Sequence, residues 1–195
     1  MIVLQKSKCV FFHNPRTGGN SISRMLDVEQ SLNPFQHVST EAAKQFLFQE
    51  TWSEYWKFAF VRNPWDRYVS LYEHLYYSPH APKPKSNSNP GGAALYSFDE
   101  WVYLVKNKFI NANPSEHPQL RWINGVDTVF QFEDRATFLP LISKRIGVEL
   151  TDLRSNTSTK QFASYADYYK KKATIDTVAE LDKAVIERFG YTFGS

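Results

Sequence analysis

The sequence predicts a single α/β domain in which helices flank a mostly parallel central sheet. Short apolar runs alternate along the chain with segments of helical pattern, the arrangement of a parallel sheet covered on both faces. The first two runs each lead into a turn and then into a helix. The length of 195 residues fits one domain over residues 1–195, and the sequence holds no internal repeat.

The first strand is expected over residues 9–13, an apolar run that ends at a turn-forming segment. Residues 14–20 follow as a glycine-containing loop, and residues 21–26 have a helical pattern. The next helix is expected over residues 40–50, where Ser39 or Thr40 can serve as the N-cap.

The second strand, residues 57–62, runs straight into Asn63 and Pro64. These two residues suit the N-cap and the first helical position, so a helix is expected over residues 64–77. Residues 78–94 contain four prolines, two glycines and several Ser and Asn, which predicts one long loop, residues 78–97. Beyond this loop we expect helices at 98–106, 118–123 and 135–146, a third strand at 128–132, and two helical stretches that end near residue 189.

The composition excludes several classes of protein. Hydrophobic residues make up 42% and charged residues 22%, which argues against disorder, and no apolar run is long enough to cross a bilayer. The N-terminal residues lack the pattern of a signal peptide, and the single Cys9 excludes an internal disulfide or a multi-thiolate metal site. A net charge of +3 is too small for a nucleic-acid coat. We expect a cytoplasmic protein without a membrane or nucleic-acid partner.

The loop of residues 13–21 has the composition of a phosphate site. Gly18 and Gly19 can adopt backbone angles closed to other residues, so that consecutive N–H groups point at one anion. The following helix N-terminus adds partial positive charge, Ser21 adds a hydroxyl, and Arg16 adds a forked, permanently charged donor. The alternative is an ordinary Gly-Gly turn beside an exposed arginine.

This loop is P-loop-like in its position between a strand and a helix, but it is not a Walker A motif. Asn20 stands where that motif has its lysine, and the basic residue Arg16 precedes the glycines instead. The departure weakens the interpretation as a magnesium–ATP site.

A second candidate anion site follows the second strand. Arg62 lies at the predicted carboxyl end of that strand, where ligands collect in open α/β sheets. Arg67 and Ser70 are three residues apart on the next helix and therefore share a face. The alternative is that Asp66 and Glu73 pair with these arginines on a solvated surface.

Two segments resemble those of sulfotransferases that use 3′-phosphoadenosine 5′-phosphosulfate (PAPS). Residues 13–21, His-Asn-Pro-Arg-Thr-Gly-Gly-Asn-Ser, resemble the family's 5′-phosphosulfate loop, His-x-Pro-Lys-Thr-Gly-Gly-Thr-Ser. Residues 60–72, Phe-Val-Arg-Asn-Pro-Trp-Asp-Arg-Tyr-Val-Ser-Leu-Tyr, resemble its 3′-phosphate segment. Softer similarity at residues 118–134, 156–158, 165–169 and 189–191 extends the resemblance over nearly the whole chain. The branch that it resembles is the carbohydrate-type sulfotransferases.

The resemblance implies PAPS as the co-substrate and no required metal. It places Arg16, Thr17, Gly18, Gly19, Asn20 and Ser21 at the 5′ end of the nucleotide, and Arg62 and Ser70 at the 3′-phosphate. Lys160 is expected to close over the nucleotide, with a solvated surface lysine as the alternative. Arg16 replaces the family's usual lysine; it keeps charge and donors but is bulkier.

The expected mechanism pairs Arg16 with a general base. Arg16 would stabilise the leaving phosphate, and histidine is the usual residue to accept the proton of an acceptor hydroxyl. We expect His37 to be that base, because some carbohydrate sulfotransferases have a comparably placed histidine; a plain loop or capping role is the alternative. Glu133 is a second candidate base, and His13 is expected to be structural.

The acceptor is expected to be a small molecule or a glycan with a free hydroxyl group. The long loop over residues 78–97 and the aromatic stretch 96–103 are the expected acceptor walls, since flat rings suit sugar faces. Further substrate contacts are expected from His74, His117 and Gln119. Two other functions stay open: a small P-loop-like kinase, and a non-catalytic module that binds a 3′-phosphonucleotide.

Overall fold

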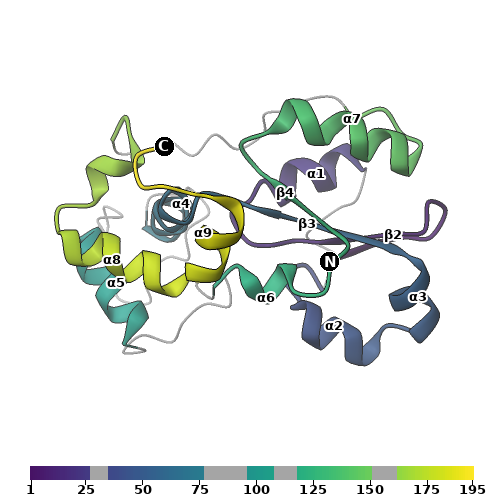
Figure 1. Ribbon diagram of the computed structural model, residues 1–195, viewed down its shortest axis with the longest axis horizontal. Helices are drawn as coiled ribbons and strands as arrows, with labels where there is room; N and C mark the ends of the chain where they lie inside the picture. The colour runs from purple at the N-terminus through teal and green to yellow at the C-terminus, as the bar shows by residue number, and fades with distance from the viewer. Residues whose placement is uncertain (27–34, 77–95, 108–117, 151–161) are drawn as a thin grey trace, which may run out of the picture. The chain divides into compact units, whose positions relative to one another are not determined.

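The computed structural model describes residues 1–26, 35–76, 96–107, 118–150 and 162–195 (Figure 1). Its contacts divide the chain into two compact units, each discontinuous in sequence. Unit 1 comprises Met1–Arg62 and Pro118–Asn156, and unit 2 comprises Asn63–His117 and Thr157–Ser195. Most of the loop predicted over residues 78–97 lies outside the described residues.

Unit 1 is built on a four-stranded sheet with the strand order β1-β2-β3-β4. Strands β2 (Cys9–Phe12), β3 (Trp56–Val61) and β4 (Thr128–Gln131) are parallel neighbours. Strand β1 (Ile2–Leu4) pairs antiparallel with β2, and the sequence had not predicted it. The expected α/β fold with a mostly parallel sheet is confirmed.

The central strands are buried on both faces, as their continuous apolar runs predicted. Cys9 and Phe11 of β2 and Phe58 and Phe60 of β3 face a core that also takes Ile22, Phe138 and Ile142 from the helices α1 (Gly19–Met25) and α7 (Arg135–Ile146). Figure 1 shows α1 and α7 on this face. The opposite face is covered by α2 (Thr40–Phe46), α3 (Gln49–Glu54) and α6 (Leu120–Ile123).

The single helix predicted over residues 40–50 is wrong, because the structure has α2 and α3 in its place. Leu47 and Phe48 adopt extended backbone angles, with ψ of 140° and 143°, and these angles interrupt the helical hydrogen bonds. The predicted start is confirmed, since the Ser39 hydroxyl accepts a hydrogen bond from the Ala42 N–H at 3.1 Å.

Unit 2 is helical, and α4 (Pro64–Tyr76) packs against α5 (Phe98–Lys106), α8 (Lys172–Leu181) and the short 3-10 helix η3 (Tyr165–Tyr168). The final helix α9 (Lys183–Phe189) contacts α8. Asn63 caps α4 as predicted, because its Oδ1 accepts a hydrogen bond from the Trp65 N–H at 3.1 Å. The Trp65 indole N–H donates to the Ile175 carbonyl at 3.0 Å and thereby ties α4 to α8.

Burial raises the pKa of the Tyr169 hydroxyl well above its usual range, and this hydroxyl donates to the Trp65 carbonyl at 2.9 Å.

Among the described helices of both units, none has the length and hydropathy that crossing a bilayer would require.

Candidate active site

The loop of residues 13–21 leaves the carboxyl end of β2 and leads into α1. Two of its residues have left-handed backbones, Arg16 with φ of 64° and Gly18 with φ of 77°. The Thr17 hydroxyl donates to the Asn14 carbonyl at 2.8 Å and closes the turn from inside. The Ser21 N–H donates to the Gly18 carbonyl at 2.9 Å and starts the helix. The first turn of α1 leaves the N–H groups of its earliest residues without an acceptor in the helix.

Both glycines are required by their surroundings. A Cβ atom on Gly19 would lie 1.8 Å from Cδ2 of the buried His13 ring. A Cβ atom on Gly18 would lie 2.3 Å from Cε2 of Phe132, and its positive φ already disfavours other residues. The two glycines therefore let the His13 and Phe132 rings pack directly against the backbone of the loop.

His37 is held against this loop by its ring and by its backbone. Its Nδ1 lies 3.2 Å from the His13 carbonyl oxygen, and the two imidazole rings are 4.5 Å apart between centroids. The Trp122 indole N–H donates to the His37 carbonyl at 3.0 Å. Because the His13 carbonyl only accepts, Nδ1 of His37 carries the hydrogen, and Nε2 is the basic nitrogen of the neutral ring. The neighbouring Gln36 amide donates to Asn20 Oδ1 at 3.4 Å.

Arg62 lies at the same sheet edge as this loop. It directly follows Val61, the last residue of β3, and β2 and β3 are parallel. Its Nη1 donates to the carbonyl oxygen of Arg16 at 3.1 Å, and its guanidinium lies 5.1 Å from the centre of the Phe132 ring. The structure therefore brings Arg16 and Arg62 together within unit 1.

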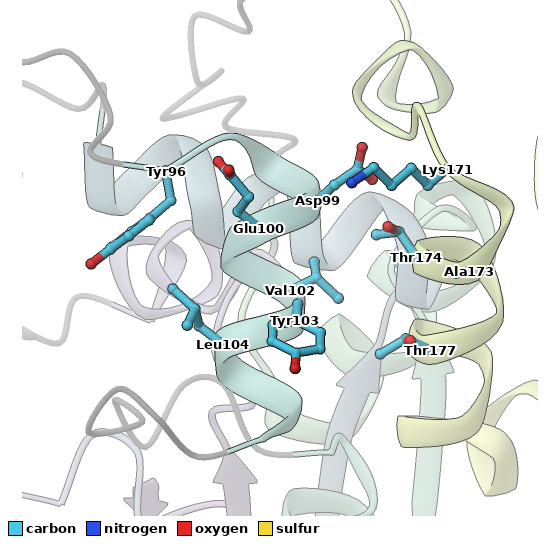
Figure 2. Close-up of a pocket in the computed structure, with 10 residues that line it drawn as sticks. All are labelled: Tyr96, Asp99, Glu100, Val102, Tyr103, Leu104, Lys171, Ala173, Thr174 and Thr177. Atoms are coloured by element: carbon cyan, nitrogen blue, oxygen red, sulfur yellow. The ribbon is translucent and has the colours of Figure 1, made fainter.

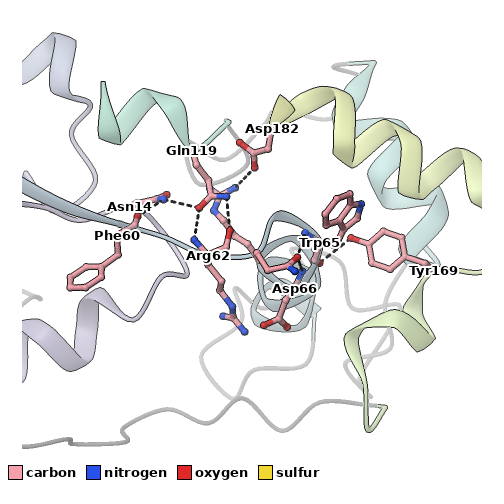
Figure 3. Close-up of polar contacts among 10 residues, drawn as sticks. Asn14, Phe60, Arg62, Trp65, Asp66, Gln119, Tyr169 and Asp182 are labelled. Atoms are coloured by element: carbon pink, nitrogen blue, oxygen red, sulfur yellow. Dashed lines mark hydrogen bonds and ion pairs between the residues drawn. The ribbon is translucent and has the colours of Figure 1, made fainter. Parts of the chain in front are cut away.

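The Gln119 side-chain amide forms hydrogen bonds with both backbone polar groups of Arg62 (Figure 3). Its Oε1 accepts the Arg62 N–H at 3.0 Å, and its Nε2 donates to the Arg62 carbonyl at 2.9 Å. The same Oε1 accepts from Asn14 Nδ2 at 3.1 Å, and Asn14 Nδ2 also donates to the Phe60 carbonyl at 2.9 Å. Both Gln119 and Asn14 are 0% exposed. Sequence reasoning did not single out Asn14, although it directly follows the predicted strand.

Two further predicted site residues, Ser70 and His74, lie on α4 in unit 2. Ser70 is buried and His74, one turn later, is half-buried. Arg67 is fully buried, and its Nη1 lies 3.8 Å from Oδ2 of the equally buried Asp182. Glu73 accepts a hydrogen bond from the Tyr168 hydroxyl. Arg67 and Glu73 therefore belong to the interior of unit 2 rather than to a solvated surface pair.

A family model described as the sulfotransferase family matches residues 1–130, about two thirds of the chain. The chain belongs to the sulfotransferase family. This membership makes sulfuryl transfer its chemistry, and it disfavours the alternative of a small kinase. No curated protein and no solved structure matches the chain.

The sulfotransferase match includes the loop of residues 13–21, Arg62, Ser70 and Gln119. Two other predicted site residues, His117 and Lys160, lie outside the described residues. Over the described part of the chain, no three His, Cys, Asp or Glu side chains are grouped as a metal site would need.

Unit 2 also contains a pocket of about 420 Å³ between α5 and α8 (Figure 2). Part of the aromatic stretch that was expected to contact the acceptor lines it, including Tyr96, Val102 and Tyr103. Thr174 and Thr177 of α8 contribute from the other side. The lining combines aromatic and aliphatic side chains with hydroxyl groups and with the charged residues Asp99, Glu100 and Lys171.

Proposed function

We propose that this sulfotransferase-family protein moves a sulfuryl group from PAPS to a hydroxyl group of an acceptor, with a carbohydrate as the acceptor class. The observation that carries the proposal is the pair of arginines at one sheet edge, Arg16 after β2 and Arg62 after β3. PAPS has anionic groups on the 5′ and 3′ sides of its ribose. Cationic side chains at two neighbouring strand ends suit such a ligand better than they suit a contiguous polyphosphate.

The loop would hold the 5′ end of the nucleotide, which supplies the activated sulfuryl group. The backbone N–H groups at Gly18 and Gly19 would donate to a phosphate, and Arg16 would add a forked, charged donor. Asn20 and Ser21 would add side-chain donors, whereas Thr17 would contribute its backbone because its hydroxyl bonds to Asn14. Charge that develops on the leaving phosphate would be stabilised by Arg16.

Arg62 and Ser70 would bind the 3′-phosphate, and Lys160 would close over the nucleotide. Arg62 can do so while keeping its bond to the Arg16 carbonyl, because a guanidinium has five N–H groups. His74, His117 and the walls formed by residues 78–97 and 96–103 would contact the acceptor.

His37 would act as the general base. Its Nδ1–H is fixed on the His13 carbonyl, so Nε2 is the nitrogen that would take the proton of the acceptor hydroxyl. The imidazolium that forms keeps the same Nδ1–H bond, which stabilises its positive charge. Glu133, an exposed residue just after β4, remains the alternative base.

The test is a transfer assay with sulfur-labelled PAPS and a panel of hydroxyl acceptors that includes mono- and oligosaccharides, phenols and sterols. We expect labelled product with the wild type and at least a tenfold loss with Arg16→Ala, since one charged hydrogen-bond partner is removed. Arg24→Ala is the matched control, because Arg24 is an exposed arginine on α1.

Two outcomes would contradict the proposal. Tight nucleotide binding without transfer to any acceptor would indicate a non-catalytic module. Magnesium-dependent phosphate transfer from ATP would indicate a kinase.

A further inference from the structure

We propose that Gln119 is a positioning residue that fixes Arg62 against the loop of residues 13–21 and thereby sets the preference for a 3′-phosphorylated nucleotide. The inference rests on the proposed function, because it uses the role given there to Arg62. It replaces the sequence-based expectation that Gln119 contacts the substrate directly.

The first argument is the pairing between Gln119 and the Arg62 backbone. Arg62 lies one residue beyond the end of β3, where the hydrogen bonds of the sheet no longer hold it. The Gln119 side-chain amide meets both backbone groups of Arg62, at 3.0 Å for the N–H and 2.9 Å for the carbonyl. A side-chain amide thus pairs as the peptide group of a neighbouring strand would, and it fixes the direction in which the arginine leaves the sheet.

The second argument is the link to the loop. Oε1 of Gln119 also accepts from Asn14 Nδ2 at 3.1 Å, and the Asn14 carbonyl accepts from the Thr17 hydroxyl at 2.8 Å. One amide therefore joins the exit of β2, which leads to Arg16, with the exit of β3, which carries Arg62. Two sites for opposite ends of one ligand need a fixed separation, and this network supplies it.

The third argument is burial. Gln119 is 0% exposed, and its two polar atoms bond to the protein, so direct contact with a substrate would require these bonds to break. Removing the amide would leave the backbone N–H and C=O groups of Arg62 without this partner. A purely structural amide would affect stability alone, whereas a positioning residue must also affect nucleotide selectivity.

The experiment compares the full-length wild type with Gln119→Met, which keeps the length of the side chain and removes its hydrogen bonds. Calorimetry gives the affinities for adenosine 3′,5′-bisphosphate and for adenosine 5′-phosphate, and urea unfolding gives the stability. We expect the preference for the bisphosphate to fall about tenfold in Gln119→Met. Ile142→Ala is the control, because it opens a cavity in the core of the same unit and leaves the polar network intact.

The outcomes separate the two proposals. A wild type without a preference for the bisphosphate would overturn the proposed function and this inference with it. A wild-type preference that Gln119→Met retains would overturn this inference alone, even if that variant is less stable.

Gln119→Glu keeps the inference testable if Gln119→Met does not fold. A protonated carboxylic acid can reproduce both amide bonds, whereas the carboxylate cannot donate to the Arg62 carbonyl. We expect the preference of Gln119→Glu, relative to the wild type at the same pH, to be near normal at acid pH and to fall as the pH rises. If the nucleotide preference of Gln119→Glu relative to the wild type did not change with pH, the inference would be overturned.

Discussion

Gly18 and Gly147 have nearly the same left-handed backbone, with φ of 77° and 74°, but their surroundings differ. A Cβ atom at Gly18 would collide with the Phe132 ring, whereas nothing lies within 4 Å of a Cβ atom at Gly147. The pair therefore separates the cost of backbone conformation from the cost of lost space.

We predict that Gly147→Ala lowers the free energy of unfolding by about 1–2 kcal/mol, the cost of a left-handed alanine. Gly18→Ala should cost a further 1–3 kcal/mol or so, because the Phe132 ring must move, and it should also weaken nucleotide binding. Urea unfolding and calorimetry check both variants. If Gly18→Ala and Gly147→Ala lost the same stability, the Phe132 ring would not restrict the space for a side chain at position 18.

At His37, the glutamine variant separates base catalysis from positioning. His37→Gln can still donate a hydrogen bond to the His13 carbonyl but cannot take a proton, so kcat should fall about 100-fold or more while the affinity for adenosine 3′,5′-bisphosphate changes little. The wild-type rate should rise from acid to neutral pH as an imidazole loses its proton, and the variant should lack that rise. Unchanged turnover would exclude His37 as the base.

At the scale of elements, the two arginines that we propose to bind the nucleotide follow the carboxyl ends of β2 and β3. Arg62 and Arg135 both lie over the Phe132 ring, at 5.1 Å and 4.9 Å, but only Arg62 also follows a central strand. Arg135 begins α7 and therefore serves as a matched control for the loss of a guanidinium at this ring.

We predict that Arg62→Ala weakens binding of adenosine 3′,5′-bisphosphate at least tenfold, from the loss of one charged hydrogen-bond partner worth about 1.5–3 kcal/mol. Binding of adenosine 5′-phosphate should weaken less, through the lost bond to the Arg16 carbonyl. Arg135→Ala should alter neither affinity greatly. If both nucleotides lost the same factor in Arg62→Ala, Arg62 would have no specific role at the 3′-phosphate.

Several elements could be predicted from the sequence because their signals are local. The helices over residues 98–106 and 135–146 have the predicted bounds, and each starts at a capping side chain, Ser97 or Asp134. Strand β1 was missed because three residues are too few for a periodic pattern. The break between α2 and α3 was missed because no glycine or proline marks Leu47 and Phe48.

Some features of the candidate site could also be predicted from the sequence, and others could not. The glycine pair and the arginine at a strand end are local patterns, so the sequence alone could indicate them. The pairing of Gln119 with Arg62 joins residues 57 positions apart, and the same amide also reaches Asn14. Such a contact depends on the tertiary path of the chain, and no pattern in a single sequence carries that information.

At the scale of the whole molecule, the chain passes from unit 1 to unit 2 between Arg62 and Asn63. The sequence segment of residues 60–72 therefore begins in unit 1 and continues in unit 2. A nucleotide that binds the native state must stabilise the whole protein against unfolding by mass action.

We predict that adenosine 3′,5′-bisphosphate at 100 times its Kd raises the free energy of unfolding by about 2.7 kcal/mol. For a chain of this size the midpoint should rise by roughly 5–10 °C, and adenosine 5′-phosphate at the same concentration should give a smaller rise. Scanning fluorimetry measures both, with Arg16→Ala as the variant that should lose at least about half of the shift, since a tenfold weaker Kd leaves about 1.4 kcal/mol at this concentration. A shift of equal size with either nucleotide would contradict the assignment of a 3′-phosphate site.

The single thiol of the chain, on Cys9, lies in the middle of the sheet at 0% exposure, and its Sγ donates to the Ser7 carbonyl at 3.2 Å. An alkylating reagent can reach that sulfur only in molecules whose sheet has come apart. The rate of alkylation thus reports how often the sheet of unit 1 opens, and the measurement needs neither an engineered label nor an optical probe.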